Sequence, residues 1–391
     1  MANIAFILNK LPDGGVERVT MNLVGPLTDM GHSVYIFVHE LYADHISDGE
    51  LPVQYVMLPY EAWDERNTAI VCNNVVKYEI DIFFSPLLAP KFIFKLKKRA
   101  LCKVIFILHG VPFYEKAEIW WRINNRKTSS LGAWLSKYLV AIPKYYLGYY
   151  DRKISKRYRH IYKHTDAFGT LFDEYSQSIA RVIGVEDMAN SKLCTLQNPL
   201  NKALDIPTDG PREKRVIYVG RLSRRDKRVD RLLMAWNIVH KNHPDWHISI
   251  VGDGDDRDAL EKIVAELKLP RVEFCGFTSS PEEFYANSEI LCLTSEFEGC
   301  PMVLLEAQSY GCATMAFDCS PGIRNILSPV WENGVYVPNG DIEAYAEALS
   351  RLMSDDELRQ KIQKNSIENV KRFSVDNSIH QYNALIEKLM K

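Results

Sequence analysis

The sequence lacks the features that define several large classes of protein. It has no apolar run near the roughly 18 residues that a membrane-spanning helix needs. Its first apolar segment, Ile4 to Leu8, is shorter than the apolar core of a secretory signal and follows no basic residues. Low-complexity tracts and short internal repeats are also missing. These absences predict a globular, cytoplasmic protein.

Patterns typical of disulfide frameworks and metal sites are missing too. The eight cysteines include no Cys-x-x-Cys pair and lie in apolar or small-residue segments, which predicts buried free thiols. Neither the pair His160 and His164 nor the group His240, His243 and His247 has an HExxH glutamate or a cysteine beside it. We therefore expect solvated surface histidines, no metal and no other cofactor.

Length and composition are those of a globular protein with two or three domains. The chain has 391 residues, of which 47% are hydrophobic and 25% are charged. Its net charge of −2 conceals an uneven distribution. Residues Lys91 to Lys163 contain 18 Lys or Arg and 3 Asp or Glu, a net charge of +15, and the remainder carries −17. One strongly basic segment in an otherwise acidic chain predicts an anionic partner.

Short apolar runs alternate with helical patterns in two separate halves of the chain. This alternation predicts parallel sheets covered on both faces by helices. The expected strands are Asn3–Leu8, Ser33–Val38, Ile82–Phe84 and Val104–Leu108, then Arg215–Val219, Trp246–Val251, Val272–Cys275, Ile290–Leu293 and Thr314–Phe317. A polar, proline-rich stretch near residues 199–212 indicates a linker. We expect domains at residues 1–199 and 200–376, with a final helix (377–391) that packs back on the first domain.

Ligands of open parallel sheets bind at the carboxyl ends of the strands, so the residues after each expected strand are candidates. Gly14 and Gly15 follow the first strand, where glycine allows close approach and a helix N-terminus favours an anion. A simple tight turn is the alternative. Arg221 and Lys227 follow the strand that ends at Val219, and two cations suit a diphosphate. Solvated loop charge explains them equally well.

The segment Ser295 to Glu306 combines the most informative residues. Pro301 suits the first turn of a helix, because its missing N–H is not needed there. Glu306 lies in an apolar stretch, where an unpartnered carboxylate is costly. Ribose hydroxyls or an internal cation could pair with it, and Glu298 just before the helix is either a ligand contact or solvated. His109, directly after a strand, is either a ligand contact or a satisfied core histidine.

Together these residues resemble the family 4 retaining glycosyltransferases of GT-B architecture. Glu298 and Glu306 have the spacing of the family's EX7E motif, within a segment similar to EGxPxxLLEAxxxG. Further similar segments are Val219–Ser223 with Lys227 and Asp230, Ile250–Gly254, Gly14–Arg18 and Asn198-Pro199. Residues 40–190 carry little of the resemblance beyond His109-Gly110. The resemblance implies two Rossmann-like, doubly wound parallel-sheet domains that face each other across a cleft.

The resemblance also implies roles for individual positions. Arg221 and Lys227 would hold the donor diphosphate, Glu306 the ribose, and Glu298 the donor sugar. His109 would contact the sugar near its reacting face. The residues assigned to donor binding are Glu306, Gly299, Cys300, Pro301, Met302, Gly252 and Phe277, and Gly14 and Gly15 are assigned to the acceptor and phosphate loop.

The implied chemistry is hexosyl transfer with retention of configuration, from a nucleotide-diphosphate sugar, with a UDP-sugar favoured. No DxD motif lies in a suitable context, so we expect cations rather than a metal to stabilise the leaving diphosphate. No side chain needs to act as a covalent nucleophile. The segment Ser320–Arg324 lacks an acidic residue that the family often has, and Cys312-Ala313 replaces its usual Gly-x-Pro. Both departures leave the choice of donor open.

Two other functions compete with this interpretation. A non-catalytic subunit of the same fold would have lost the diphosphate cations or the two glutamates, yet all four residues are present. A nicotinamide-dependent oxidoreductase needs a GxGxxG turn, and the turn Gly252–Gly254 lacks the third glycine.

The basic segment is also rich in aromatic residues, which suits an anionic membrane surface. We predict that Trp120, Trp121 and Trp134 face the membrane; a core-facing helix with solvated charges is the alternative. We then expect the acceptor to be a lipid-linked saccharide in bacterial surface polysaccharide or lipopolysaccharide synthesis. This places the protein peripherally on the inner face of the cytoplasmic membrane, with no nucleic-acid partner.

Overall fold

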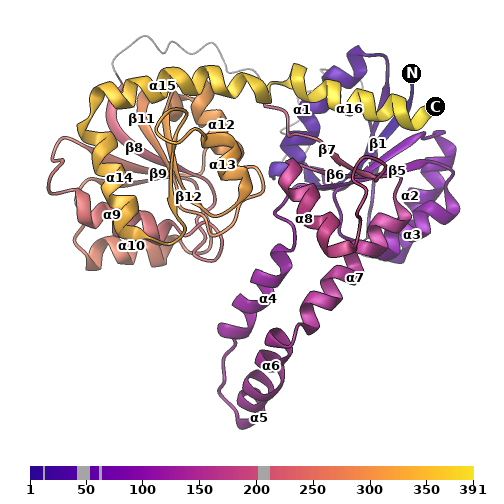
Figure 1. Ribbon diagram of the computed structural model, residues 1–391, viewed down its shortest axis with the longest axis horizontal. Coiled ribbons are helices and arrows are strands. Elements are labelled where there is room, and N and C mark those ends of the chain that lie inside the picture. The colour runs from indigo at the N-terminus through magenta and orange to yellow at the C-terminus, as the bar shows by residue number, and fades with distance from the viewer. Residues whose placement is uncertain (12–13, 42–52, 61–63, 201–211) are drawn as a thin grey trace. The chain divides into compact units, whose positions relative to one another are not determined.

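Two separate parallel sheets organise the chain. The computed structural model describes residues 1–11, 14–41, 53–60, 64–200 and 212–391. Contacts divide it into a first unit, Met1–Pro199 with Val375–Lys391, and a second unit, Leu200–Ser374 (Figure 1). Most of the expected linker lies outside the described residues. The expected limit at residue 376 falls in the first turn of α16 (Val375–Met390), which belongs to the first unit.

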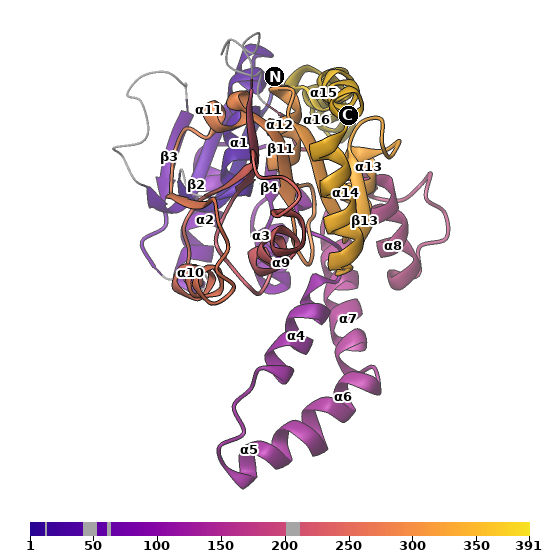
Figure 2. The same cartoon turned by 90° about the vertical axis from the view of Figure 1, so that its left-hand side faces the viewer.

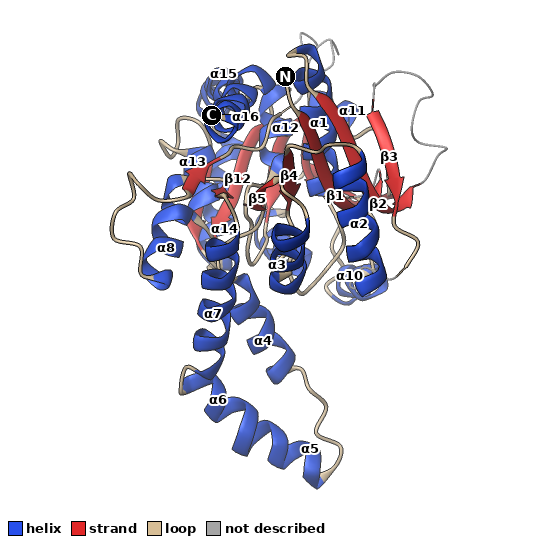
Figure 3. Ribbon diagram, turned by 90° about the vertical axis from the view of Figure 1, so that its right-hand side faces the viewer, coloured by secondary structure: helices blue, strands red, loops and turns tan. Residues whose placement is uncertain are grey.

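The first unit contains a seven-stranded parallel sheet with strand order β3-β2-β1-β4-β5-β6-β7. Its strands are β1 (Asn3–Leu11), β2 (Ser33–Leu41), β3 (Val53–Met57), β4 (Ile82–Ser85), β5 (Lys103–Leu108), β6 (Ala167–Thr170) and β7 (Leu193–Thr195). Its main helices are α1 (Gly15–Asp29), α2 (Glu65–Lys77), α3 (Pro90–Arg99), α7 (Tyr149–His164) and α8 (Asp173–Ile183). Figure 3 shows these helices flanking the strands.

Alternate residues of β1 pack against different helices, as the pleat of a strand requires. Ile4 and Phe6 share a buried cluster with residues of α1 and α16. Ala5 and Ile7 share another with residues of α2, α3, α7 and α8. Tyr382 of α16 is fully buried, so the last helix completes the first unit's core.

The second unit contains a six-stranded parallel sheet with order β10-β9-β8-β11-β12-β13. Its strands are β8 (Glu213–Val219), β9 (His247–Val251), β10 (Val272–Gly276), β11 (Ser288–Leu293), β12 (Ala313–Asp318) and β13 (Val335–Pro338). Its helices are α9 (Val229–Val239), α10 (Arg257–Glu266), α11 (Glu282–Asn287), α12 (Met302–Ser309), α13 (Pro321–Leu327), α14 (Ile342–Ser354) and α15 (Asp356–Val370). The predicted fold class, two Rossmann-like parallel-sheet domains, is confirmed.

A helical hairpin extends from the first unit between β5 and β6 (Figures 1 and 2). It consists of α4 (Tyr114–Asn124), α5 (Leu131–Leu135), the π-helix η2 (Ser136–Ala141), α6 (Ile142–Tyr146) and α7. Exposed apolar and aromatic side chains occupy residues 131–149, among them Leu131, Leu139, Tyr146 and Leu147. Among the described helices, none combines the length and apolar character that crossing a membrane requires.

Candidate active site

The two charged segments singled out in the sequence follow neighbouring strands of the second unit. Strands β8 and β11 pair directly, although two other strands lie between them in sequence. The strand order reverses at this pair, and open parallel sheets bind ligands at such a point. Arg221 and Lys227 follow β8, and Glu298 and α12 follow β11.

Lys227 and Glu298 form a partly buried ion pair at this edge of the sheet. The Lys227 Nζ lies 2.6 Å from the Glu298 Oε1, and the Ser295 hydroxyl donates to the same oxygen at 2.6 Å. The Thr294 hydroxyl donates to the Lys227 carbonyl at 3.2 Å, which ties the two loops together. Burial alone lowers the pKa of Lys227, but the charge and hydrogen bond of Glu298 outweigh it, so the pKa is raised.

Arg221 is the more exposed cation of the site. Its side chain is 66% exposed and its Nη2 lies 2.6 Å from the Asp226 Oδ2. The Asp226 carbonyl accepts from the Glu296 N–H at 2.7 Å, and the buried Tyr218 hydroxyl donates to the Arg221 carbonyl at 2.9 Å. Burial alone raises the pKa of Asp226, but a hydrogen bond from Ser223 and the charge of Arg221 outweigh it and lower the pKa. The guanidinium therefore has an ionised partner and an open side.

Glu306 is only partly buried, which corrects the expectation from its apolar neighbours. The Tyr285 hydroxyl, from α11, donates to its Oε2 at 2.8 Å. The carboxylate thus accepts a hydrogen bond from a neutral hydroxyl. From the sequence, its expected partner was either a ligand or an internal cation. Pro301 is the N-cap of α12, with Met302 as the first helical residue, so the helix begins one residue later than expected.

Gly252 has a structural reason to be glycine. Its φ is +136°, and a Cβ would overlap the Gly220 carbonyl. The Gly252 N–H donates to the Gly276 carbonyl at 2.8 Å, so the turns after β8, β9 and β10 pack backbone to backbone. Phe277 follows the edge strand β10 and is 75% exposed. The structure thus places Phe277 three strands away from β11.

Cys300 lies between Gly299 and Pro301, in the loop that leads into α12. Burial, with a smaller contribution from the Glu298 charge, raises the pKa of the Cys300 thiol to about 12. The thiol is therefore protonated at neutral pH and is a poor nucleophile. The first N–H groups of α12, beginning with Met302, have no acceptors within the helix and can meet an anion.

Three candidate residues belong to the first unit. Gly14 is the N-cap of α1 at the end of β1, with φ +113°, and a Cβ there would overlap the Glu17 carboxylate; Gly15 has open space. His109 follows β5, and its Nδ1 lies 3.1 Å from the Oδ1 of the buried Asn198. Burial lowers the pKa of His109 to about 4, although the Asn198 contact acts in the opposite direction. The ring is therefore neutral at pH 7, and the contact with Asn198 leaves Nε2 as an acceptor.

The three tryptophans of the hairpin have different surroundings. Trp121 is 42% exposed and Trp134 is 45% exposed. Trp120 is partly buried and packs on Tyr145, with ring centroids 4.6 Å apart. Two of the three rings that we expected to face a membrane are thus exposed, and Trp120 helps to hold the hairpin together.

One expectation about the histidines is wrong. His243 is buried, with its Nε2 2.8 Å from the Ser350 hydroxyl, because the residues after α9 pack against α14. The rings of His160 and His164 contact each other in a tilted arrangement, with centroids 4.2 Å apart. Within the described ranges, no group of three or more His, Cys, Asp or Glu residues is arranged to hold a metal.

Four residues position the candidates in a way that the sequence analysis did not assign. Ser295 and Asp226 lie close to Glu298 and Lys227 in sequence, so a search for polar neighbours would have found them. Two others, Tyr285 and Asn198, lie 21 and 89 residues from the groups they contact. No local pattern connects residues that are so far apart.

Comparisons with known proteins agree with this fold. Residues 205–369 match the family described as "Glycosyl transferases group 1". The amylovoran biosynthesis glycosyltransferase AmsD of Erwinia amylovora is 30% identical over 191 residues, 49% of this chain and 52% of the relative. A lipopolysaccharide 1,6-galactosyltransferase of Salmonella typhimurium is 33% identical over 186 residues, 46% of this chain and 49% of the relative. The matches thus span about half the length of these curated relatives.

The fold resembles that of a solved structure along its whole length. The crystal structure of HepE from Anabaena, in complex with UDP, aligns with a TM-score of 0.74 over 99% of this chain and 100% of HepE, at 16% sequence identity. At this identity the likeness concerns the fold alone. The chain thus has the GT-B fold, and its residues 205–369 match the group 1 glycosyl transferase family.

Proposed function

We propose that the protein is a retaining, metal-independent glycosyltransferase that moves a hexosyl unit from a nucleotide-diphosphate sugar to a saccharide acceptor. The observation that carries the proposal is the cluster of Arg221, Lys227 and Glu298 beside the N-terminus of α12. A UDP-sugar is the favoured donor, in keeping with the UDP bound to HepE. The names of the relatives favour a role in bacterial surface polysaccharide or lipopolysaccharide synthesis.

The cations act on the leaving group. When the bond between the anomeric carbon and the diphosphate oxygen breaks, positive charge develops on the sugar ring and negative charge on the diphosphate. Lys227, Arg221 and the first N–H groups of α12 stabilise that negative charge, which is commonly the largest electrostatic contribution of an enzyme. A metal ion is not needed for this role.

Donor binding changes the partner of Lys227. A diphosphate at the strand ends competes with the Glu298 carboxylate for the ammonium group. Glu298 keeps the hydrogen bond from Ser295. The lone pairs that faced Lys227 can then accept hydrogen bonds from hydroxyls of the donor sugar. Glu306 has lone pairs beyond the one that Tyr285 occupies, and these accept the ribose hydroxyls.

The acceptor hydroxyl attacks the face of the sugar from which the diphosphate departs, so configuration is retained. This route uses no covalent intermediate. The protonated state of the Cys300 thiol fits that route, because the thiol would be a weak nucleophile. The neutral His109 offers Nε2 as an acceptor for a sugar hydroxyl.

The hairpin supports a lipid-linked acceptor and peripheral binding at the inner face of the cytoplasmic membrane. Residues 114–164 contain 12 Lys or Arg and 3 Asp or Glu. Between Leu131 and Leu147 the hairpin exposes rings and aliphatic chains, including Trp134. Apolar and aromatic residues near cations are the combination that binds an anionic membrane surface.

A donor screen tests the proposed function. Thermal unfolding is measured with UDP, GDP and their hexose conjugates, and release of nucleotide is then followed with a saccharide acceptor. We expect one nucleotide class to raise the melting temperature and to be turned over. If no nucleotide sugar stabilises the wild-type protein, the proposal fails. A protein that binds a nucleotide sugar but never releases nucleotide fits the alternative, a non-catalytic subunit.

A further inference from the structure

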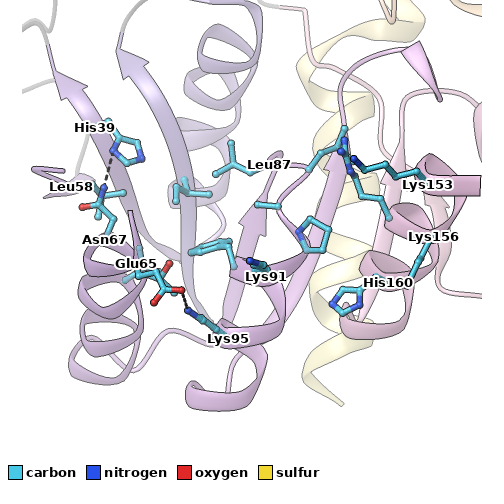
Figure 4. Close-up of a pocket in the computed structure, with 18 residues that line it drawn as sticks. His39, Leu58, Glu65, Asn67, Leu87, Lys91, Lys95, Lys153, Lys156 and His160 are labelled. Atoms are coloured by element: carbon cyan, nitrogen blue, oxygen red, sulfur yellow. Dashed lines mark hydrogen bonds and ion pairs between the residues drawn. The ribbon is translucent and has the colours of Figure 1, made fainter. Parts of the chain in front are cut away.

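The first unit contains a pocket of about 750 Å³ whose wall includes the stem of the hairpin. Side chains from α2, α3 and α7 line it together with residues of the sheet and its loops (Figure 4). Its volume lies within the roughly 300–1,000 Å³ of small-molecule sites. None of the residues proposed above to bind the donor lines this pocket.

The pocket is largely apolar on the side of the sheet. Apolar side chains from the strands, their following loops and the two neighbouring helices line this part: Ile7, Leu58, Val71, Leu87, Leu88 and Phe92. Ile7, Leu58 and Val71 are almost completely buried and belong to the first unit's core. These six side chains carry no hydrogen-bonding groups, although His39, Asn67 and Thr68 line the same pocket, so this part of the wall suits a hydrocarbon chain better than a sugar.

Cations from two helices also line the pocket. The lining residues include five cations, Lys91 and Lys95 from α3 and Lys153, Lys156 and Arg157 from α7, against the single carboxylate of Glu65. Lys95 pairs with Glu65 at 2.5 Å, and Arg157 pairs with Glu115 at 3.3 Å. Within the described parts of the chain, Lys153 and Lys156 take part in no ion pair. These two lysines are one turn apart on the same helix, so both can reach one anion.

An apolar surface beside unpaired cations complements an anion that carries a hydrocarbon tail. We propose that this pocket binds a single-chain lipid phosphate or diphosphate, which is the anchor of the saccharide acceptor. The inference rests on the proposed function and names the acceptor's class. A free sugar would bring no negative charge to the lysines, and a free phosphate would bring no hydrocarbon to the apolar surface. Helix α7 lines the pocket and is also part of the hairpin whose far end exposes apolar side chains.

Calorimetric titration with farnesyl phosphate tests the pocket directly. We expect saturable binding, and binding that is at least roughly tenfold weaker for inorganic phosphate and for farnesol, because each lacks one half of the complementary chemistry. Equal affinity for inorganic phosphate would make this a free-anion site. Equal affinity for farnesol would make it a neutral apolar site. Either outcome overturns the proposal.

Three variants test whether farnesyl phosphate binds in this pocket. Lys153→Ala/Lys156→Ala should weaken farnesyl phosphate binding by roughly tenfold or more through loss of two cations. The control Arg152→Ala/Lys163→Ala removes the same charge from exposed positions of α7 that do not line the pocket, and should bind like the wild type. Thr68→Trp should block binding by filling the pocket. Unfolding curves show that each variant folds, and an equal loss in both double variants overturns the proposal.

The two proposals fail in different ways. UDP binding is measured in the same samples. A wild-type protein that binds UDP but not farnesyl phosphate overturns the lipid site and leaves the transferase intact. A protein that binds farnesyl phosphate but no nucleotide overturns the proposed function and leaves the pocket as a lipid-phosphate site.

Discussion

The Lys227 ammonium lies 2.6 Å from the Glu298 carboxylate, although 71 residues separate them in sequence. The pair forms because β8 and β11 are neighbours in the sheet, so the loops that follow them meet at one edge. In the proposed function, Lys227 provides charge to the leaving diphosphate, and Glu298 holds its ammonium group in place before the donor binds. The predictions below test this site first.

Loss of either cation should slow transfer. Arg221→Ala and Lys227→Ala should each lower kcat by roughly one to three orders of magnitude, because each removes charge that stabilises the leaving diphosphate. Steady-state nucleotide release measures the effect. Arg224→Ala is the control, since it removes an exposed cation from the same loop and should retain activity. If Arg221→Ala keeps wild-type activity, the role assigned to Arg221 at the leaving diphosphate is wrong.

Glu306 should bind the ribose hydroxyls of the donor. The wild type should bind UDP more tightly than 2′-deoxy-UDP, and Glu306→Ala should weaken UDP binding and abolish that preference. Tyr285→Phe, which removes the hydroxyl that donates to Glu306, should have a smaller effect because the carboxylate remains. Calorimetry gives both affinities. A preference for UDP that survives in Glu306→Ala would place the ribose elsewhere.

Turnover should not require a divalent metal. If Lys227, Arg221 and the N-terminus of α12 supply positive charge at the leaving group as proposed, EDTA should leave the rate of transfer largely unchanged. The rate is measured after dialysis against EDTA and again after addition of manganese. Activity that disappears in EDTA and returns with manganese contradicts the prediction.

The hairpin should bind anionic vesicles reversibly. Each Lys or Arg near such a surface contributes about 1 kcal/mol, and at 1 M salt the Debye length falls to about 3 Å, so high salt should release the protein. Trp121→Ala/Trp134→Ala should weaken the binding that resists salt, because both rings are exposed. Co-sedimentation measures the bound fraction. If the wild type does not bind anionic vesicles at low salt, a soluble acceptor becomes the better interpretation.

His109 should make stability depend on pH. Its folded pKa is about 4, below the ordinary value of 6.5, so the folded state resists protonation. The resulting stability is complete above pH 6.5 and is lost as the pH falls from 6.5 towards 4, by on the order of 3 kcal/mol. Urea unfolding of the wild type and His109→Gln at pH 7 and pH 5 isolates this contribution. Parallel losses in the two proteins would contradict it.

The sequence by itself determined the class of fold and the positions of the charged candidates. Runs such as Ile4 to Leu8 are apolar without alternation because parallel strands are buried on both faces, and that pattern is local. The spacing between Glu298 and Glu306 is local as well. Strands β3, β6, β7 and β13 were not identified from the sequence, because their three to five residues lack the clear apolar run that marks the equally short β4.

Only the tertiary structure decided which partners these residues have. Tyr285 meets Glu306, and Asn198 meets His109, because the packing of separate elements brings distant segments together. The pocket beside Lys153 and Lys156 likewise requires α2, α3 and α7 to surround one part of the sheet. Composition showed that the hairpin is basic and aromatic, but exposure depends on neighbours, so only the fold could separate the packed Trp120 from the exposed rings.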